Sequence, residues 1–126
     1  MFKLSQKSLK KLEGVHPDLV RVVIKAITLT NLDFCVTEGL RSVERQKQLV
    51  AAGASKTMRS RHLTGHAVDL AAMVNGEIRW DWPLYAKLAE FMKDAAKSEN
   101  VKIEWGGDWT TFKDGPHFQL PWETYP

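Results

Sequence analysis

Apolar and polar residues alternate with a helical period in the first quarter of the chain. Residues 5–13 predict a short helix with Ser5 as its N-cap and Gly14 beyond its end. Pro17 opens a second helix, because proline is favoured in a first helical turn. The apolar positions of this second helix recur at helical spacing and predict one buried face: Leu19, Val22, Val23, Ala26 and Ile27.

Strand-like segments follow in the rest of the chain. Residues 34–41 and 66–74 are rich in β-branched and apolar side chains. The Asn75 and Gly76 pair predicts a hairpin turn after the second of these segments. The list of expected strands is completed by residues 77–80, 101–105 and 117–120.

Two more helices are expected between these strands. Ser42 is the predicted N-cap of a helix over 43–52, which places Arg41 at a strand-to-helix junction. A longer amphipathic helix is predicted from about 83 to 98, with Leu84, Leu88, Phe91 and Ala95 on its buried face. This mixture of helices and strands predicts an α+β fold with a small antiparallel sheet and flanking helices.

Length and composition narrow the class of protein. A chain of 126 residues with 44% hydrophobic residues is expected to form a single domain, 1–126. It has neither the apolar segment of a signal peptide nor a run long enough to insert into a membrane. Its single cysteine, Cys35, is expected to be a small buried residue and suits a reducing cytoplasm. The net charge is only +3, and the basic residues are scattered among acidic ones, so the sequence does not indicate nucleic-acid binding.

The four histidines differ in their suitability as metal ligands. His16 precedes Pro17 at a helix start, where a capping or solvent-exposed role is expected. His62 and His66 have the spacing of zinc ligands on a helix, but Gly65 and the strand-like sequence after it argue against a helix there. We therefore expect that only one of this pair binds a metal.

Asp69 lies within the predicted strand 66–74, where a carboxylate would stand at the edge of the core. Such a group needs a cation or several hydrogen-bond donors, unless it is an ordinary core or turn residue. A zinc ion bound by Asp69, by His62 from the preceding loop and by His117 from the last strand would supply the cation. These ligands would leave a fourth position for water, which is the arrangement of a catalytic zinc site.

The motifs around these residues resemble a known family. Residues 60–69, SRHLTGHAVD, fit the pattern Ser-x-His-x-x-Gly-x-Ala-x-Asp, with GLR before them and WGGDW and DGPHF after them. Together they resemble the VanY-like zinc peptidases of bacterial cell walls, which have a hedgehog/DD-peptidase-like fold. That family includes D-alanyl-D-alanine carboxypeptidases and the L-alanyl-D-glutamate endopeptidases of phages. The similarity spans roughly residues 34–120.

The resemblance implies catalytic roles for residues of this chain. It implies that His62, Asp69 and His117 bind zinc at the edge of the sheet. Asp114 occupies the position of the general base, and Arg41 that of the cation which stabilises the oxyanion. From the residues alone, Arg41 could instead form a salt bridge with Glu38 or Glu44.

Substrate contacts are expected for a further set of residues. Ser60 matches the motif serine, which either supports the ligands or contacts the substrate. Trp109 is expected to line a groove for the peptide, and Trp105 either lines that groove or packs in the core. His66 fills a variable position of the motif and is not implied as a ligand.

Asp114, three residues before the last histidine, distinguishes between branches of the family. The carboxypeptidase branch usually has glutamate there, so this chain resembles the endopeptidase branch. The expected protein is a monomeric zinc endopeptidase that cleaves the peptidoglycan stem peptide at the L-Ala–D-Glu bond as a phage or prophage endolysin. It is expected to have no separate wall-binding domain or signal peptide, and to stay in the host cytoplasm until lysis exposes the periplasmic peptidoglycan. The alternatives are a D-Ala-D-Ala carboxypeptidase and a non-catalytic zinc domain that binds wall peptides.

Overall fold

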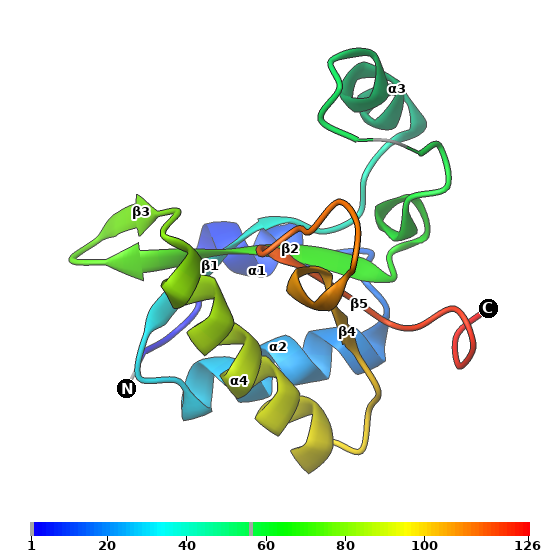
Figure 1. Ribbon diagram of the computed structural model, residues 1–126. Coiled ribbons are helices and arrows are strands. Elements are labelled where there is room, and N and C mark those ends of the chain that lie inside the picture. Colours follow the sequence, from blue (N-terminus) through cyan, green and yellow to red (C-terminus); the bar gives the residue numbers. More distant parts are fainter. Residues whose placement is uncertain (1, 56) are drawn as a thin grey trace.

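The computed structural model describes residues 2–55 and 57–126. Within these ranges five strands form one antiparallel sheet in the order β1-β2-β5-β4, with β3 paired to β2. Figure 1 shows α2 and α4 side by side across one face of this sheet, and α3 standing away from it. The predicted α+β fold with a small antiparallel sheet is therefore confirmed. The strands are β1 (Asp33–Glu38), β2 (Ala67–Val74), β3 (Glu77–Arg79), β4 (Glu104–Trp105) and β5 (His117–Gln119).

The helices begin close to the residues that the capping signals indicate. The Ser5 and Ser42 side chains cap α1 and α3, accepting hydrogen bonds from the Ser8 and Arg45 amides. The buried face of α2 contains all the residues that its apolar spacing predicts. In the described residues no helix has both the length and the apolar character needed to cross a membrane. The helices are α1 (Gln6–Lys11), α2 (Pro17–Leu29), α3 (Val43–Ala51) and α4 (Trp82–Ser98), with 3-10 helices η1 (Arg61–Thr64) and η2 (Gly106–Asp108).

The buried face of α4 is rotated relative to the prediction. Leu84 and Phe91 are only partly buried, whereas Tyr85 and Met92 are buried in the core. The Tyr85 hydroxyl donates to the Arg79 carbonyl at 2.7 Å and accepts from the Ala72 amide at 3.2 Å. These bonds to β2 and β3 turn Tyr85 towards the sheet and set the rotation of the helix.

Two of the predicted strands end or begin three residues away from the bounds that their sequence patterns suggest, whereas the others differ by one residue. The segment 101–105 contributes only Glu104 and Trp105, because the Val101 amide still donates to the Ala96 carbonyl at the end of α4. The segment 34–41 leaves the sheet after Glu38, and the Arg41 amide then donates to the His62 carbonyl. In both segments the backbone bonds therefore go to residues outside the neighbouring strand, namely to the end of α4 and to η1.

The register of β2 aligns three strands at Asp69. Asp69 lies opposite His117 of β5 on one side and opposite Glu38 of β1 on the other. A β-bulge interrupts β1 between Val36 and Glu38, so Thr37 has no partner position on β2. This extra residue brings the Glu38 carboxylate to the same region as Asp69 and His117.

Gly65 connects η1 to β2, and a substitution there measures how tightly this junction is packed. Gly65 and Gly53 have nearly the same left-handed backbone, with φ of 75° and 77°. A Cβ atom on Gly65 would lie 2.3 Å from the Gly14 carbonyl oxygen, whereas one on Gly53 would meet nothing within 4 Å. We expect Gly53→Ala to lower the free energy of unfolding by about 1–2 kcal/mol through backbone strain. Gly65→Ala should lower it by about 1–3 kcal/mol more, because the junction must move.

Urea unfolding of both variants, followed by circular dichroism, measures this difference. Equal destabilisation of the two variants would contradict the close packing of Gly65 against the segment that follows α1.

Candidate active site

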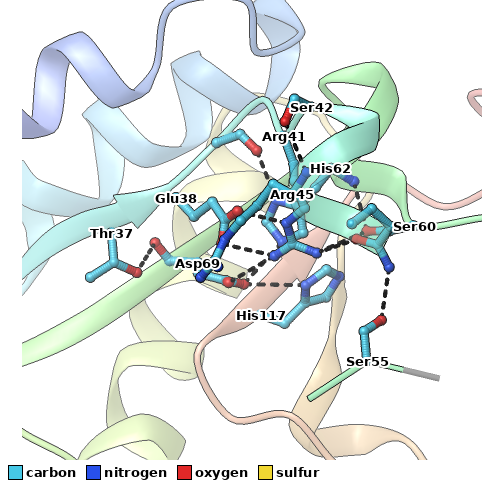
Figure 2. A network of polar contacts seen from close by, with 12 residues as sticks. Thr37, Glu38, Arg41, Ser42, Arg45, Ser55, Ser60, His62, Asp69 and His117 are labelled. Carbon is cyan, nitrogen blue, oxygen red and sulfur yellow. Dashed lines mark hydrogen bonds and ion pairs between the residues drawn. The ribbon is translucent and has the colours of Figure 1, made fainter. Parts of the chain in front are cut away.

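The side chains of His62, Asp69 and His117 converge where β2 begins. They come from η1, β2 and β5, and one ligand atom of each lies within 4.8 Å of the others. The Asp69 Oδ1 atom is 3.2 Å from His62 Nε2 and 3.3 Å from His117 Nδ1. Figure 2 shows both rings directed at this carboxylate. Both histidines are buried, while Asp69 is partly buried.

Hydrogen bonds outside this group select which nitrogen of each ring faces Asp69. The Nδ1–H of His62 donates to the Gly39 carbonyl oxygen at 2.8 Å, which leaves Nε2 towards the carboxylate. The Nε2–H of His117 donates to Oε1 of Gln119 at 2.8 Å, which leaves Nδ1 towards it. Such anchoring of the second ring nitrogen is typical of metal-binding histidines.

The electrostatics of the group favour a bound cation. Burial opposes the charge on Asp69, but hydrogen bonds from His117 and His62 outweigh it and hold the Asp69 pKa well below its usual value. Burial also opposes the charge on His117, yet the hydrogen bond and charge of Asp69 raise the His117 pKa. Two ring nitrogens and a carboxylate oxygen that face one another need a proton or metal ion between them. The residues present therefore fit a divalent metal ion.

Arg41 lies in the same region and is held by an ion pair. Its Nε and Nη2 atoms donate to the two carboxylate oxygens of Glu38 at 2.6 and 2.8 Å, and Nη2 is 3.8 Å from Asp69 Oδ2. The Arg41 side chain is only 8% exposed. The salt bridge with Glu38 therefore exists, and it fixes the guanidinium beside Asp69 instead of leaving it on the surface.

Asp114, Ser60 and Trp109 line one cleft with these groups, with a volume of about 550 Å³. Burial and the nearby charge of Asp69 raise the pKa of the Asp114 carboxyl. The Ser60 hydroxyl caps η1 by accepting from the His62 amide and lies 3.5 Å from Arg41 Nη1. The Trp109 ring lies 5.1 Å from the His117 ring. Each residue that the sequence placed in the site thus borders this cleft.

The remaining histidines and Trp105 have structural positions. His16 caps α2 by accepting from the Asp18 amide at 3.0 Å, so of its two expected roles capping is the one observed. The His66 ring packs 5.5 Å from the His16 ring, outside the group around Asp69. Trp105 is buried in the core and donates to the Gly115 carbonyl, so of its two expected positions the core is the one observed.

Gln46 and Gln119 support the site but were not predicted from the sequence. Gln46 on α3 is fully buried and accepts a hydrogen bond from Arg41 Nη1 at 2.8 Å. Its amide nitrogen donates to the Ser55 hydroxyl at 2.9 Å. Gln119 follows His117 by two positions in β5, and that strand periodicity could have indicated that the two side chains share a face. Gln46 had no comparable local signal.

Comparison with known proteins places the chain in a family. A model of the phage L-alanyl-D-glutamate peptidase family matches residues 1–120. The L-alanyl-D-glutamate peptidase of Escherichia phage T5 is 33% identical over 117 residues, which cover 90% of this chain and 85% of that protein. These matches confirm the resemblance to the endopeptidase branch.

Solved structures agree with this assignment. The L-Ala D-Glu endopeptidase ChiX of Serratia marcescens has 50% sequence identity and a TM-score of 0.93, with 98% of this chain and 94% of that chain covered. The D,D-dipeptidase VanXYg has a TM-score of 0.55 at 20% identity, with 84% of this chain and 50% of that chain covered, and shares the fold. Because the family model matches nearly all of its length, the chain belongs to the phage L-alanyl-D-glutamate peptidase family.

Proposed function

We propose that this chain is a zinc-dependent endopeptidase that hydrolyses the L-alanyl–D-glutamate bond in the stem peptide of peptidoglycan. The observation that carries the proposal is the convergence of His62, Asp69 and His117, with each ring anchored through its second nitrogen. The names of the phage T5 relative and of ChiX support the choice of bond.

His62 Nε2, Asp69 Oδ1 and His117 Nδ1 would hold the metal ion. Zinc suits this set, because imidazole and carboxylate ligands are typical of catalytic zinc sites that keep one position open. A zinc ion in such a site lowers the pKa of water towards about 7 and polarises a carbonyl group.

Asp114 acts as the general base and then as the general acid. Its carboxylate takes a proton from the attacking water and passes it to the amine that leaves when the peptide bond breaks. The raised pKa of Asp114, caused by burial and by the charge of Asp69, suits a group that must both accept and release a proton.

Arg41 stabilises the negative charge that develops on the carbonyl oxygen of the substrate. A cation stabilises such a charge best when it is already in position before the reaction. The two hydrogen bonds from Arg41 to the Glu38 carboxylate hold the guanidinium in position. Ser60 supports Arg41 and the start of η1, and Trp109 forms a wall of the cleft for the peptide.

The biological role that we propose is lysis of a host cell by a phage or prophage enzyme. The protein would stay in the host cytoplasm until lysis and then act on the periplasmic wall. One chain brings all the proposed catalytic residues together, which supports a single catalytic domain that works as a monomer. ChiX comes from a bacterium, so the activity is not restricted to proteins found in phages.

Digestion of purified peptidoglycan identifies the bond. We expect new amino termini on D-glutamate and new carboxyl termini on L-alanine, identified by mass spectrometry of the released fragments. Release of terminal D-alanine would identify a carboxypeptidase instead. Binding of zinc and wall peptides without any cleavage would identify a non-catalytic domain.

Substitutions separate metal binding from proton transfer. We expect Asp114→Ala to bind one zinc ion per chain like the wild type, while kcat falls about 10²–10⁴-fold because the general base is lost. His62→Ala should lose both zinc and activity. Metal analysis after dialysis, together with turnover of peptidoglycan fragments, gives both quantities. Full activity of Asp114→Ala would exclude Asp114 as the base.

Gln119 provides a test of the proposed zinc geometry. Gln119→Leu removes the acceptor that orients the His117 ring, and we expect zinc affinity to fall about 10–100-fold. Gln48→Leu, at an exposed position of α3, is the matched control and should leave the affinity unchanged. Competition with a chelator measures both constants. Equal affinities in the two variants would show that the ring of His117 needs no such support.

A further inference from the structure

The cleft has a cationic end that the proposed mechanism does not use. Arg59, Arg61 and Trp122 line the same cleft as His62 and Asp114. The guanidinium carbon of Arg61 lies 4.2 Å from the centroid of the Trp122 ring, and that of Arg59 lies 5.4 Å from it. Two cations therefore stack on one indole that belongs to the C-terminal segment.

Arg61 is a buried cation without an acidic partner. It is 3% exposed, and its guanidinium donates to the carbonyl oxygens of Leu120 and Tyr125. Among the residues described, no carboxylate lies within ion-pair distance of Arg61, although the charge of Glu104 acts on it. Carbonyl oxygens satisfy its donors but leave its charge unneutralised, so this end of the cleft attracts an anion.

Arg59 carries hydrogen-bond donors that are available to a ligand. It is exposed and its guanidinium lies over the Trp122 ring, and within the described ranges it forms no side-chain hydrogen bond or ion pair. Arg41 differs, because it already has an acidic partner: its Nε and Nη2 atoms donate to the carboxylate of Glu38. A planar guanidinium with free donors matches the two oxygens of a carboxylate.

The position of Arg59 and Arg61 fits a peptide that is bound at the proposed catalytic residues. Arg59 precedes His62 by three residues, so their Cα atoms are at most about 11 Å apart. A substrate residue one to three positions beyond the scissile bond spans a similar length. Glu38 and Asp114 line the same cleft near Asp69, and their charges would repel a carboxylate there.

We propose that Arg59, stacked on Trp122 beside Arg61, binds a free carboxylate of the stem peptide on the glutamyl side of the scissile bond. This inference rests on the proposed function and adds a substrate feature to it. D-Glutamate has two carboxyl groups, so one stays free when the other is linked to the next residue. The last residue of the stem offers a second carboxylate of the same chemistry.

Three synthetic stem peptides with the L-Ala–D-Glu bond test the inference. One keeps both carboxylates, one has the glutamyl carboxylate as an amide, and one has the terminal carboxylate as an amide. With the first peptide and zinc-loaded protein, Arg59→Gln should raise KM about tenfold and leave kcat within about twofold, as for loss of a charged hydrogen bond outside the reacting atoms. Arg59→Lys should recover part of the loss, and Trp122→Leu should raise KM because the stacking surface is removed.

Arg45→Gln is the matched control. Arg45 is an exposed arginine on α3 that does not line the cleft, so the same change in charge should leave KM unchanged. The peptide whose amidation raises the wild-type KM and abolishes the effect of Arg59→Gln identifies the carboxylate that is bound.

The outcomes separate this inference from the proposed function. If Arg59→Gln changes KM equally for all three peptides, or for none, the carboxylate subsite is wrong while the endopeptidase activity stands. If Arg59→Gln lowers kcat and leaves KM unchanged, the subsite is also wrong. If the wild type cleaves none of the peptides, the proposed function fails and this inference fails with it.

Discussion

The alignment of β1, β2 and β5 at Asp69 is the constraint on which the site depends. Side chains alternate between the faces of a strand, so a shift of one residue would move every side chain of that strand to the other face. The bulge at Thr37 introduces one such shift within β1, and the Thr37 hydroxyl donates to the Asp69 carbonyl at 3.3 Å (Figure 2). Glu38 can therefore hold Arg41 next to Asp69, while Val36 and Phe34 remain in the core.

Glu38, Arg41 and Asp69 are arranged so that each has a neighbour that compensates its charge. Glu38 balances Arg41, and Asp69 faces two imidazoles that favour a cation between them. In the part of the chain that the structure describes, no buried side-chain nitrogen or oxygen lacks a hydrogen-bond partner. Because every one of these buried polar atoms has a hydrogen-bond partner, the polar side chains around Asp69 can pack against the apolar core without a large loss of stability. Arg61 departs from the pattern, because carbonyl oxygens satisfy its donors without neutralising its charge.

The sequence was informative wherever local chemistry determines structure. Helix caps at Ser5 and Ser42, the buried face of α2 and the turn at Asn75 and Gly76 all depend on residues close in the chain. The motif spacing likewise indicated which side chains would meet around Asp69. The rotation of α4 could not be predicted, because it depends on hydrogen bonds between Tyr85 and the strands. The ring nitrogens that His62 and His117 present to Asp69 could not be predicted either, because they depend on bonds to the Gly39 carbonyl and to the Gln119 side chain. The role of Gln46 could not be predicted, because only the tertiary fold brings it to Arg41.

The separation of α3 from the sheet has a consequence for how enzymes of this kind can diverge. Its inner side anchors Arg41 through Gln46, whereas its outer side faces solvent and none of its residues belongs to the group around Asp69. Loops and elements with few core contacts tolerate changes of length better than strands in a sheet. A change of length in the exposed turn at 52–54 that keeps the bond from Gln46 to Ser55 would therefore reshape one wall of the cleft and leave the group around Asp69 in place.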